Sequence, residues 1–157
     1  MTLVAVVVAA MLLSGCAMVG GERSSSPPPP GSTAAVAANK KVVVDFYRTV
    51  FIEKKVREGF ERYVAPDYIE HSPHVRPNRD AILKALSQRV TKESIADMKR
   101  VIAEGDLVVL HVHARNNLQD RGRAVVEIFR VAHGRIVEHW DVVQPVPPRL
   151  ANTNSMF

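Results

Sequence analysis

The sequence predicts an α+β domain in which three N-terminal helices pack on one face of a curved antiparallel sheet. Two observations predict this fold class. Apolar residues recur at helical spacing between residues 39 and 89, and they alternate with polar residues after residue 95. Glycine-containing turns separate the alternating segments, as in an antiparallel meander. Helices followed by such a meander favour a sheet covered on one side.

Length and composition are compatible with one globular domain. The chain has 157 residues, of which 46% are hydrophobic and 24% are charged, which is enough for a single core. The net charge of +5 would suit a nucleic-acid partner. The basic residues, however, are interleaved with acidic ones and form no block or recognition motif. We therefore expect a solvated charged surface and no nucleic-acid partner.

Residues 1–15 have the features of a signal peptide. The apolar run at residues 2–13 is too short for a helix that crosses a bilayer, but it has the length of a signal-peptide core. It ends in Leu13-Ser14-Gly15-Cys16, which resembles a bacterial lipobox. The resemblance implies cleavage before Cys16, a lipid anchor on its sulfur and a location at the cell envelope, facing the periplasm or the exterior. The alternative is a buried apolar segment with a core cysteine.

The next segment, residues 16–38, is expected to be a tether between this anchor and the domain. It contains three consecutive serines and four consecutive prolines, with few residues to bury. Cys16 is the only cysteine, so no disulfide within the chain is expected. The folded domain is predicted at residues 39–146, followed by a flexible tail at residues 147–157.

Three helices are predicted within the domain. The first begins near Asn39, and the second covers residues 56–64 and ends at Pro66. The third covers residues 79–89, because Asn78 can cap its first turn. Each helix is predicted from a stripe of apolar residues at helical spacing. In chain order, the stripes consist of Val43, Phe46, Tyr47, Val50 and Phe51 in the first helix, Val56, Phe60 and Tyr63 in the second, and Ile82, Leu83 and Leu86 in the third.

Four strands are predicted after the helices. A brief extended segment at residues 68–71 precedes the third helix. Gly105-Asp106 and His133-Gly134 are expected to form tight hairpin turns. The predicted strands cover residues 95–104, 107–115, 124–132 and 135–143.

Two segments resemble a known family. Residues 126–141, VEIFRVAHGRIVEHWD, resemble the C-terminal hairpin of SnoaL-like proteins, which belong to the nuclear-transport-factor-2-like, ketosteroid-isomerase-like superfamily. Residues 68–73, YIEHSP, resemble the Tyr…His-Asn-Pro element of the same proteins. The resemblance covers residues 40–145 and implies a cone-shaped pocket enclosed by sheet and helices. The superfamily includes polyketide cyclases, isomerases, dehydratases, epoxide hydrolases and members without a known reaction.

Strand alternation predicts which side chains face the pocket. In the last strand, Val137, His139 and Asp141 share one face. In the strand before it, Glu127 and Phe129 share one face. The resemblance implies an acid/base role for Asp141, and it places Glu127 where the related cyclases have an assisting histidine. We therefore predict Asp141, Glu127 and His139 as catalytic residues, with Phe129 lining the pocket.

Further residues complete the predicted site. Two carboxylates that face one partly apolar cavity would leave one as a proton donor beside a base. A histidine held in one tautomer by a carboxylate could serve as base or proton shuttle. His111 and His113 share one face of their strand and would join the site if that face is concave. The ligand-binding residues predicted in addition to Phe129 are Tyr68, His71, His111 and His113.

Several of these residues have a simpler interpretation. Glu127 could pair across the sheet with one of the arginines Arg115, Arg123 and Arg130. His71 could only stabilise a turn. The histidines of the second strand could lie at a homodimer interface, since the open sheet of this superfamily commonly dimerises. With His71 and a carboxylate they could also bind a metal, but neither their spacing nor the resemblance favours this, so no metal site is predicted.

Three classes of function follow from these residues. The first is an enzyme of isomerase, cyclase or lyase type that uses acid/base chemistry on a small apolar carbonyl or hydroxyl compound. The second is a non-catalytic lipoprotein that binds an apolar ligand. The third is a protein-interaction module with a filled pocket. The sequence contains no nucleotide, flavin or phosphate-loop signature, so no cofactor is expected.

Overall fold

A computed structural model of the chain describes residues 28–157. The predicted signal peptide, Cys16 and the first part of the predicted tether lie outside these residues. No helix within residues 28–157 has both the length and the apolar character needed to cross a membrane. The elements, in chain order, are α1 (Thr33–Tyr47), the π-helical turn η1 (Arg48–Ile52), α2 (Val56–Tyr63), β1 (Val64–Glu70), α3 (Arg79–Arg89), β2 (Ile95–Glu104), β3 (Leu107–Arg115), β4 (Arg123–Ala132) and β5 (Arg135–Pro145).

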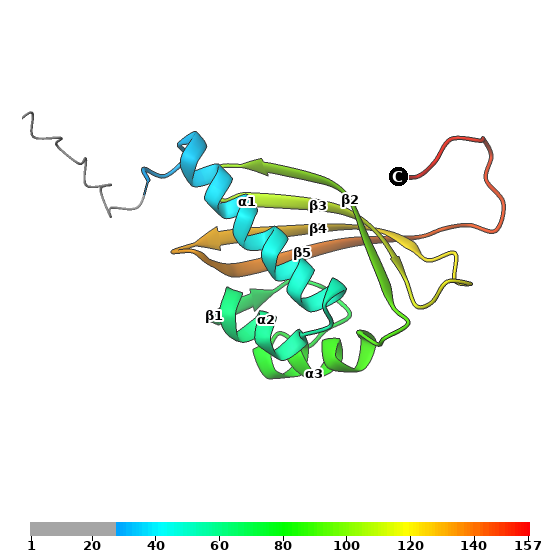
Figure 1. Cartoon of the computed structure of the whole chain (residues 1–157), viewed down its shortest axis with the longest axis horizontal. Helices are drawn as coiled ribbons and strands as arrows, with labels where there is room; N and C mark the ends of the chain where they lie inside the picture. Colours follow the sequence, from blue (N-terminus) through cyan, green and yellow to red (C-terminus); the bar gives the residue numbers. More distant parts are fainter. Residues whose placement is uncertain (1–27) are drawn as a thin grey trace, which may run out of the picture.

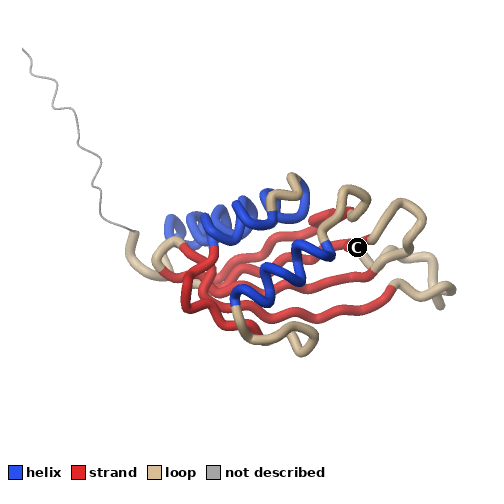
Figure 2. Tube along the Cα trace, turned by 90° about the horizontal axis from the view of Figure 1, so that it is seen from below, coloured by secondary structure: helices blue, strands red, loops and turns tan. Residues whose placement is uncertain are grey.

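The helices form one layer and the curved sheet forms the other, which confirms the predicted α+β class. Figure 1 shows α1 running across the strands, with α2 and α3 beside β1. Figure 2 shows the longest helix running along one side of the strands, and another helix in front of them. The strand order is β1-β5-β4-β3-β2, and the sheet is open. We call the side that faces the helices the inner face and the other side the outer face.

The sheet is mixed, so the prediction of a purely antiparallel sheet is wrong for its first strand. Strands β2 to β5 form the predicted antiparallel meander. Strand β1, however, runs parallel to β5, with Val64 opposite Ile136. Pro66 does not stop β1, because this strand is at the edge of the sheet and its ladder is irregular between Val64 and Ile69. The sequence therefore indicated only the end of this strand.

The element boundaries agree with the prediction to within two residues for α2, α3 and β2 to β5, but not for β1 or for α1. This helix begins at Thr33, where the Ser32 hydroxyl accepts a hydrogen bond from the Ala35 amide at 3.2 Å. The helix begins before Asn39, where the domain was predicted to start, because the alanine-rich segment after Ser32 is a good helix former despite its lack of bulky side chains. The predicted cap of α3 is confirmed, since the Asn78 side chain accepts from the Ala81 amide at 3.0 Å.

The core lies between the inner face and the helices. Phe46 of α1 connects the layers, because its ring contacts Phe60 of α2 at 5.7 Å and Phe129 of β4 at 5.9 Å, both edge to face. The largest side chains that are almost completely buried come from both layers: Tyr47, Phe60, Leu110, Ile136, Val43, Val50, Val64, Val108 and Val112.

The hairpin between β4 and β5 contains a bulge that changes strand alternation. Both turn residues, His133 and Gly134, have the left-handed φ values of a primed turn, 51° and 72°. Val131 pairs with Ile136, but Arg130 pairs with Glu138, so Val137 is the extra residue. Ile136 is therefore on the inner face and is fully buried. The bulge interrupts the regular alternation from which Val137 was predicted to share a face with His139.

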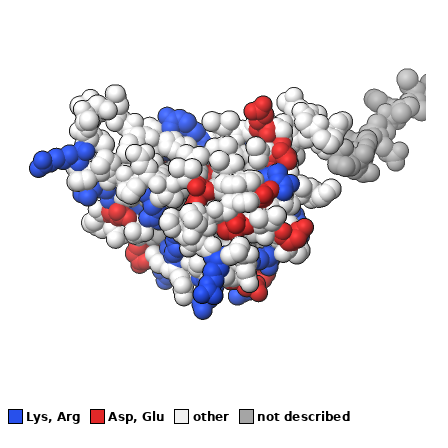
Figure 3. Space-filling model, turned by 180° about the vertical axis from the view of Figure 1, so that it is seen from behind, with Lys and Arg blue, Asp and Glu red and all other residues white. Residues whose placement is uncertain are grey.

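Charges on the outer side of the molecule are mixed. Figure 3, seen from the side opposite to Figure 1, shows acidic and basic side chains interspersed with uncharged areas. Several pairs offset one another locally, including Asp97 with Lys99 at 2.6 Å and Arg130 with Glu138 at 2.6 Å. This distribution agrees with a solvated charged surface.

The bulge can be tested with a matched pair of substitutions. We expect Ile136→Ala to lower the free energy of unfolding by about 3 kcal/mol, because it leaves a cavity in the core. Val137→Ala should lower it by less than about 1 kcal/mol, because Val137 is only partly buried. Urea denaturation of both variants measures the difference. A larger loss for Val137→Ala would show that regular alternation, and not the bulge, describes this strand.

Candidate functional site

A cavity of about 130 Å³ lies between the helices and the inner face of the sheet. Five of the predicted site residues line it: Tyr68, Glu127, Phe129, His139 and Asp141. Apolar side chains from both layers form much of the remaining wall, including Phe46, Phe51, Leu86, Val125 and Val143. The sheet brings the predicted residues together because Glu127 pairs with Asp141, and Phe129 pairs with His139, on neighbouring strands.

His139 lies between two carboxylates. Its Nδ1 is 2.8 Å from Oε1 of Glu70, and its Nε2 is 2.7 Å from Oε2 of Glu127. The side chains of His139, Glu70 and Glu127 are only 11%, 3% and 13% exposed, respectively. Three strands therefore meet at this group, because Glu70 ends β1, Glu127 is in β4 and His139 is in β5. We refer to Glu70, His139 and Glu127 as the Glu-His-Glu cluster.

Two ionised carboxylates on the ring nitrogens of His139 match a cationic imidazole. An ionised carboxylate can only accept hydrogen bonds, whereas a neutral imidazole has one N–H donor. Two carboxylates on the two ring nitrogens therefore bind His139 with both nitrogens protonated. Burial alone would lower the pKa of His139, but the hydrogen bonds and charges of Glu127 and Glu70 outweigh it and raise that pKa to about 10. His139 is thus protonated at neutral pH, and the predicted role as a base does not hold there.

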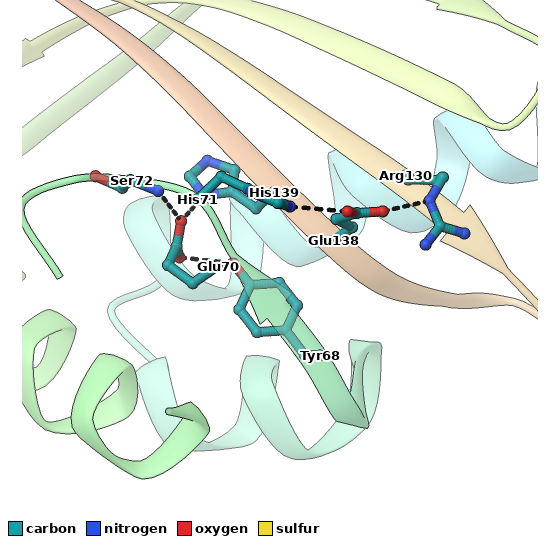
Figure 4. A network of polar contacts seen from close by, with 7 residues as sticks. All are labelled: Tyr68, Glu70, His71, Ser72, Arg130, Glu138 and His139. Atoms are coloured by element: carbon teal, nitrogen blue, oxygen red, sulfur yellow. Dashed lines mark hydrogen bonds and ion pairs between the residues drawn. The ribbon is translucent and has the colours of Figure 1, made fainter. Parts of the chain in front are cut away.

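Glu70 is held by three donors. The Tyr68 hydroxyl donates to Oε2 of Glu70 at 2.8 Å, and the Ser72 amide donates to Oε1 at 2.9 Å, in addition to His139 (Figure 4). Burial would raise the pKa of Glu70, but His139 and these two donors outweigh it and lower that pKa below the usual value. The Tyr68 hydroxyl is itself buried close to several carboxylates, which raises its pKa. Glu70 is therefore an anion that fixes one side of His139.

Glu70 was not predicted from the sequence as a site residue. The available signal was the alternation of Tyr68 and Glu70, which places both side chains on one face of an extended segment. That signal was insufficient because the inner position of β1 depends on its pairing with β5, which is distant in the sequence. Glu127 does not pair with an arginine, as the simpler interpretation would have it, because its contact is His139.

Asp141 has an open carboxylate next to the Glu-His-Glu cluster. It lines the cavity directly opposite Glu127 in the register of β4 and β5. Within residues 28–157, its carboxylate has no hydrogen-bond or ion-pair partner. Asp141 is thus the acidic residue of the cavity that is available to contact a bound molecule.

His71 was predicted to bind the ligand, but the structure does not place it among the residues that line the cavity. Its ring stacks on Trp140 at 4.7 Å, and its Nε2 donates to Glu138 at 2.8 Å. Arg130 donates to the other oxygen of Glu138 at 2.6 Å (Figure 4). These residues lie on the outer face, because Trp140 and Glu138 alternate with the inward His139.

The prediction is also wrong for His111 and His113, which lie on the outer face of β3. The inner positions of this strand are taken by Val108, Leu110 and Val112, all fully buried. Arg100 donates to His111 at 2.8 Å, and His113 donates to the Arg121 carbonyl at 2.8 Å. The predicted flexible tail ends against them, because the ring of Phe157 stacks on His113 at 4.1 Å. Figure 1 shows this tail turning back after β5.

The positions of His71, His111 and His113 also test whether these histidines could share a metal ion. His71 contacts Trp140 and Glu138 near β5, whereas His111 and His113 contact residues of β2, the following loop and the tail. Across residues 28–157, no three histidine, cysteine or acidic side chains are grouped so that they could hold a metal ion. The interpretation of these histidines as metal ligands therefore has no support in this part of the chain.

Solved structures of other proteins have the same fold as this chain. A candidate ketosteroid isomerase from Kribbella flavida is 14% identical, with a TM-score of 0.63 over 77% of this chain and 93% of that one. An NTF2-like protein of unknown function from Cytophaga hutchinsonii is 14% identical, with a TM-score of 0.57 over 68% and 90%. A candidate polyketide cyclase from Acidithiobacillus ferrooxidans is 17% identical, with a TM-score of 0.55 over 68% and 87%. At these identities the likeness shows the NTF2-like fold alone.

The family follows from the sequence of the domain. Residues 41–149 match the model of the SnoaL-like polyketide cyclase family, which covers more than half of the chain. The chain therefore belongs to the SnoaL-like polyketide cyclase family. None of the curated proteins gives a significant match.

The Glu-His-Glu cluster predicts a specific dependence of stability on pH. A pKa of His139 raised from 6.5 to about 10 adds stability that is fully present below pH 6.5 and is lost as the pH rises through about 10. The lowered pKa of Glu70 adds stability that is lost in acid. We expect His139→Gln to lower the free energy of unfolding at pH 6.5 by about 3 kcal/mol and to remove most of the alkaline decline.

The control for this experiment is His74→Gln, because His74 is exposed and lies outside the cavity. It should keep the wild-type dependence on pH. Urea denaturation at intervals between pH 5 and pH 10 measures all three proteins. If wild type and His139→Gln lose stability in parallel above pH 7, His139 is not held as a cation in the folded protein.

Proposed function

We propose that the cavity carries out acid/base chemistry of isomerase or cyclase type, without a cofactor, on a small apolar carbonyl compound. The observation that carries this proposal is the carboxylate of Asp141. It faces a largely apolar cavity, has no partner within residues 28–157 and lies opposite a glutamate that a buried cation holds in place. A carboxylate with no partner of its own can accept a proton from a bound molecule that lies within hydrogen-bond distance.

The proposed reaction begins with proton removal from a carbon next to the carbonyl group. The Asp141 carboxylate accepts this proton, and the electron pair of the broken C–H bond forms an enolate whose charge lies on the carbonyl oxygen. In an isomerisation, Asp141 returns the proton to a different carbon of the conjugated system. In a cyclisation, the enolate carbon attacks a second carbonyl of the same molecule, and Asp141 gives the proton to the new alkoxide. Neither route changes the oxidation state overall.

The Glu-His-Glu cluster has a positioning role in this proposal. His139 donates to one oxygen of Glu127, which fixes the glutamate directly opposite Asp141. The positive charge of His139 also offsets two of the three carboxylates that line this end of the cavity. Glu70 in turn fixes the ring of His139. The resemblance implies a histidine in the related cyclases at the position of Glu127, so this chain differs from them at the residue opposite Asp141.

The chain is also proposed to be a lipoprotein anchored to a membrane through Cys16 and exposed on the cell envelope. The support is the lipobox-like sequence Leu13-Ser14-Gly15-Cys16 after a short apolar run, followed by a proline-rich segment. An anchor of this kind would hold the cavity close to a source of apolar molecules.

The proposed chemistry can be tested without knowledge of the natural substrate. The probe is 2-tetralone, an apolar ketone whose α-hydrogens exchange with deuterium of the solvent when a base removes them. We expect the wild-type protein to accelerate this exchange and Asp141→Asn to reduce the acceleration at least about 100-fold, because the amide cannot accept the proton. Proton NMR in heavy water follows the exchange.

The control variant is Asp97→Asn on the outer face, where Asp97 pairs with Lys99. It should exchange the probe at the wild-type rate. If the wild type and Asp141→Asn both bind 2-tetralone but neither accelerates its exchange, the cavity is a binding site only. That result would favour the non-catalytic lipoprotein over the enzyme.

The anchor can be tested separately in a bacterial host. We expect the full chain to incorporate an alkyne-labelled fatty acid and to fractionate with membranes, because acyl chains on Cys16 stabilise membrane binding. Cys16→Ala should lose both the label and the membrane association. Ser14→Ala keeps the cysteine and a small residue before it, so it should retain both. Membrane association of Cys16→Ala equal to the wild type would contradict the lipid anchor.

A further inference from the structure

We propose that Arg123 binds a carboxylate of the ligand, so that the cavity takes an apolar carboxylic acid whose carbonyl group lies near Asp141. This inference rests on the proposed function for the position of the reacting carbonyl. The binding of the acid group itself depends only on Arg123 and on the cavity that it lines.

Arg123 is on the inner face at one end of β4. It pairs with Ala114 of β3 and Pro145 of β5, and it alternates with the inward residues Val125 and Glu127. Burial and the charge of Glu127 raise the pKa of the Tyr47 hydroxyl, and the positive charge of Arg123 acts on it in the opposite direction. The guanidinium is therefore close enough to the core to affect a fully buried tyrosine.

No acidic side chain within residues 28–157 forms an ion pair with Arg123. In the described part of the chain, the one hydrogen bond of its side chain is a long contact of 3.4 Å to the side-chain oxygen of Asn116. Glu70 and Glu127 are used by His139. The nearby Asp120 accepts from the amides of Asn116 and Gly122, both at 2.9 Å. A guanidinium has five N–H donors, so most of those of Arg123 remain for a ligand.

The backbone before Arg123 is fixed by its neighbours. Gly122 has a left-handed φ of 76°, and a Cβ atom there would collide with the carbonyl oxygen of Ala114. The Gly122 carbonyl accepts a hydrogen bond from the Val146 amide at 3.0 Å. The loop from Asn116 to Gly122 is thus held against β3 and β5, which sets where Arg123 enters the cavity.

The distance between Arg123 and the acidic end of the cavity indicates the shape of the ligand. Arg123 and Glu127 are four residues apart on one strand, which corresponds to about 13 Å between their Cα atoms. The wall between them includes Val125 and Val143. A ligand that reaches both ends would carry an anionic group, then an apolar segment, then a carbonyl group. A carboxylate suits this site because its two oxygens match the planar guanidinium.

Arg89 lines the same cavity from the end of α3, but it is exposed. It belongs to the same end as Arg123, because α3 leads into Ile95, which pairs with Arg115 beside the Ala114–Arg123 pair. At this exposed position Arg89 adds positive charge at the rim, which would attract an anionic ligand.

The test compares octanoate with octan-1-ol by isothermal titration calorimetry. These probes have chains of equal length and differ in the acid group. We expect the wild type to bind octanoate at least about tenfold more tightly than octan-1-ol, because a charged hydrogen-bonded pair adds that much. Arg123→Gln should lose this preference and keep the affinity for octan-1-ol, whereas Arg123→Lys should keep part of it. Arg121→Gln, on the neighbouring exposed arginine, should behave as the wild type.

Three results would overturn the inference. These are equal affinity of the wild type for the two probes, equal effects of the substitutions at Arg123 and Arg121, and tighter binding of octyl phosphate than of octanoate.

Asp141→Asn separates this inference from the proposed function. If this variant and the wild type exchange 2-tetralone equally slowly but prefer octanoate equally, the acid site stands and the proposed chemistry fails. If exchange depends on Asp141 but octanoate is not preferred, the acid site alone fails.

Discussion

The site depends on one physical constraint, which is that the buried positive charge of His139 must be paired with negative charges. His139 is almost completely enclosed, and an imidazolium there is stable only because carboxylates occupy both ring nitrogens. One of these carboxylates comes from β4 and the other from β1. The parallel pairing of β1 with β5 is what brings Glu70 to His139, and the backbone bond from the His71 amide to the His139 carbonyl at 2.9 Å fixes the end of that pairing. The cluster therefore links the edge strand to the centre of the sheet.

The sheet separates two sets of polar groups. On the inner face, the Glu-His-Glu cluster and Asp141 lie at one end of the cavity and Arg123 lies at the other. On the outer face, His71, Glu138 and Arg130 form a network that water can reach. The bulge at Val137 decides this division, since it allows Ile136 to fill the core while His139 and Asp141 still point inward. The cavity therefore has an acidic end and a basic end with an apolar wall between them, so an elongated ligand with unlike ends would bind in one orientation.

Local features of the sequence predicted most elements. The cap at Asn78, the turn at His133-Gly134 and the alternation in β2 and β3 depend on neighbouring residues, and each was placed correctly. Features that depend on distant pairing were not predicted: the parallel strand β1, the bulge and the contact between Glu70 and His139. Alternation sorted the residues of β3 into two sets, Val108, Leu110 and Val112 on one face and Val109, His111 and His113 on the other, but it did not by itself state which set faces the helices. In the structure, Val108, Leu110 and Val112 are buried on the inner face, so the two histidines lie on the outer face.

The most direct test of this account is the protonation state of His139. Two-dimensional NMR of the protein labelled with nitrogen-15 resolves the two ring nitrogens of each histidine, and His139→Gln assigns the signal. We predict that both nitrogens of His139 carry a proton at pH 8, and that they titrate only as the pH approaches 10. A single protonated nitrogen at pH 8 would mean that His139 is neutral in the folded protein. The cluster would then not be an ion-paired group, and the account of the site would be contradicted.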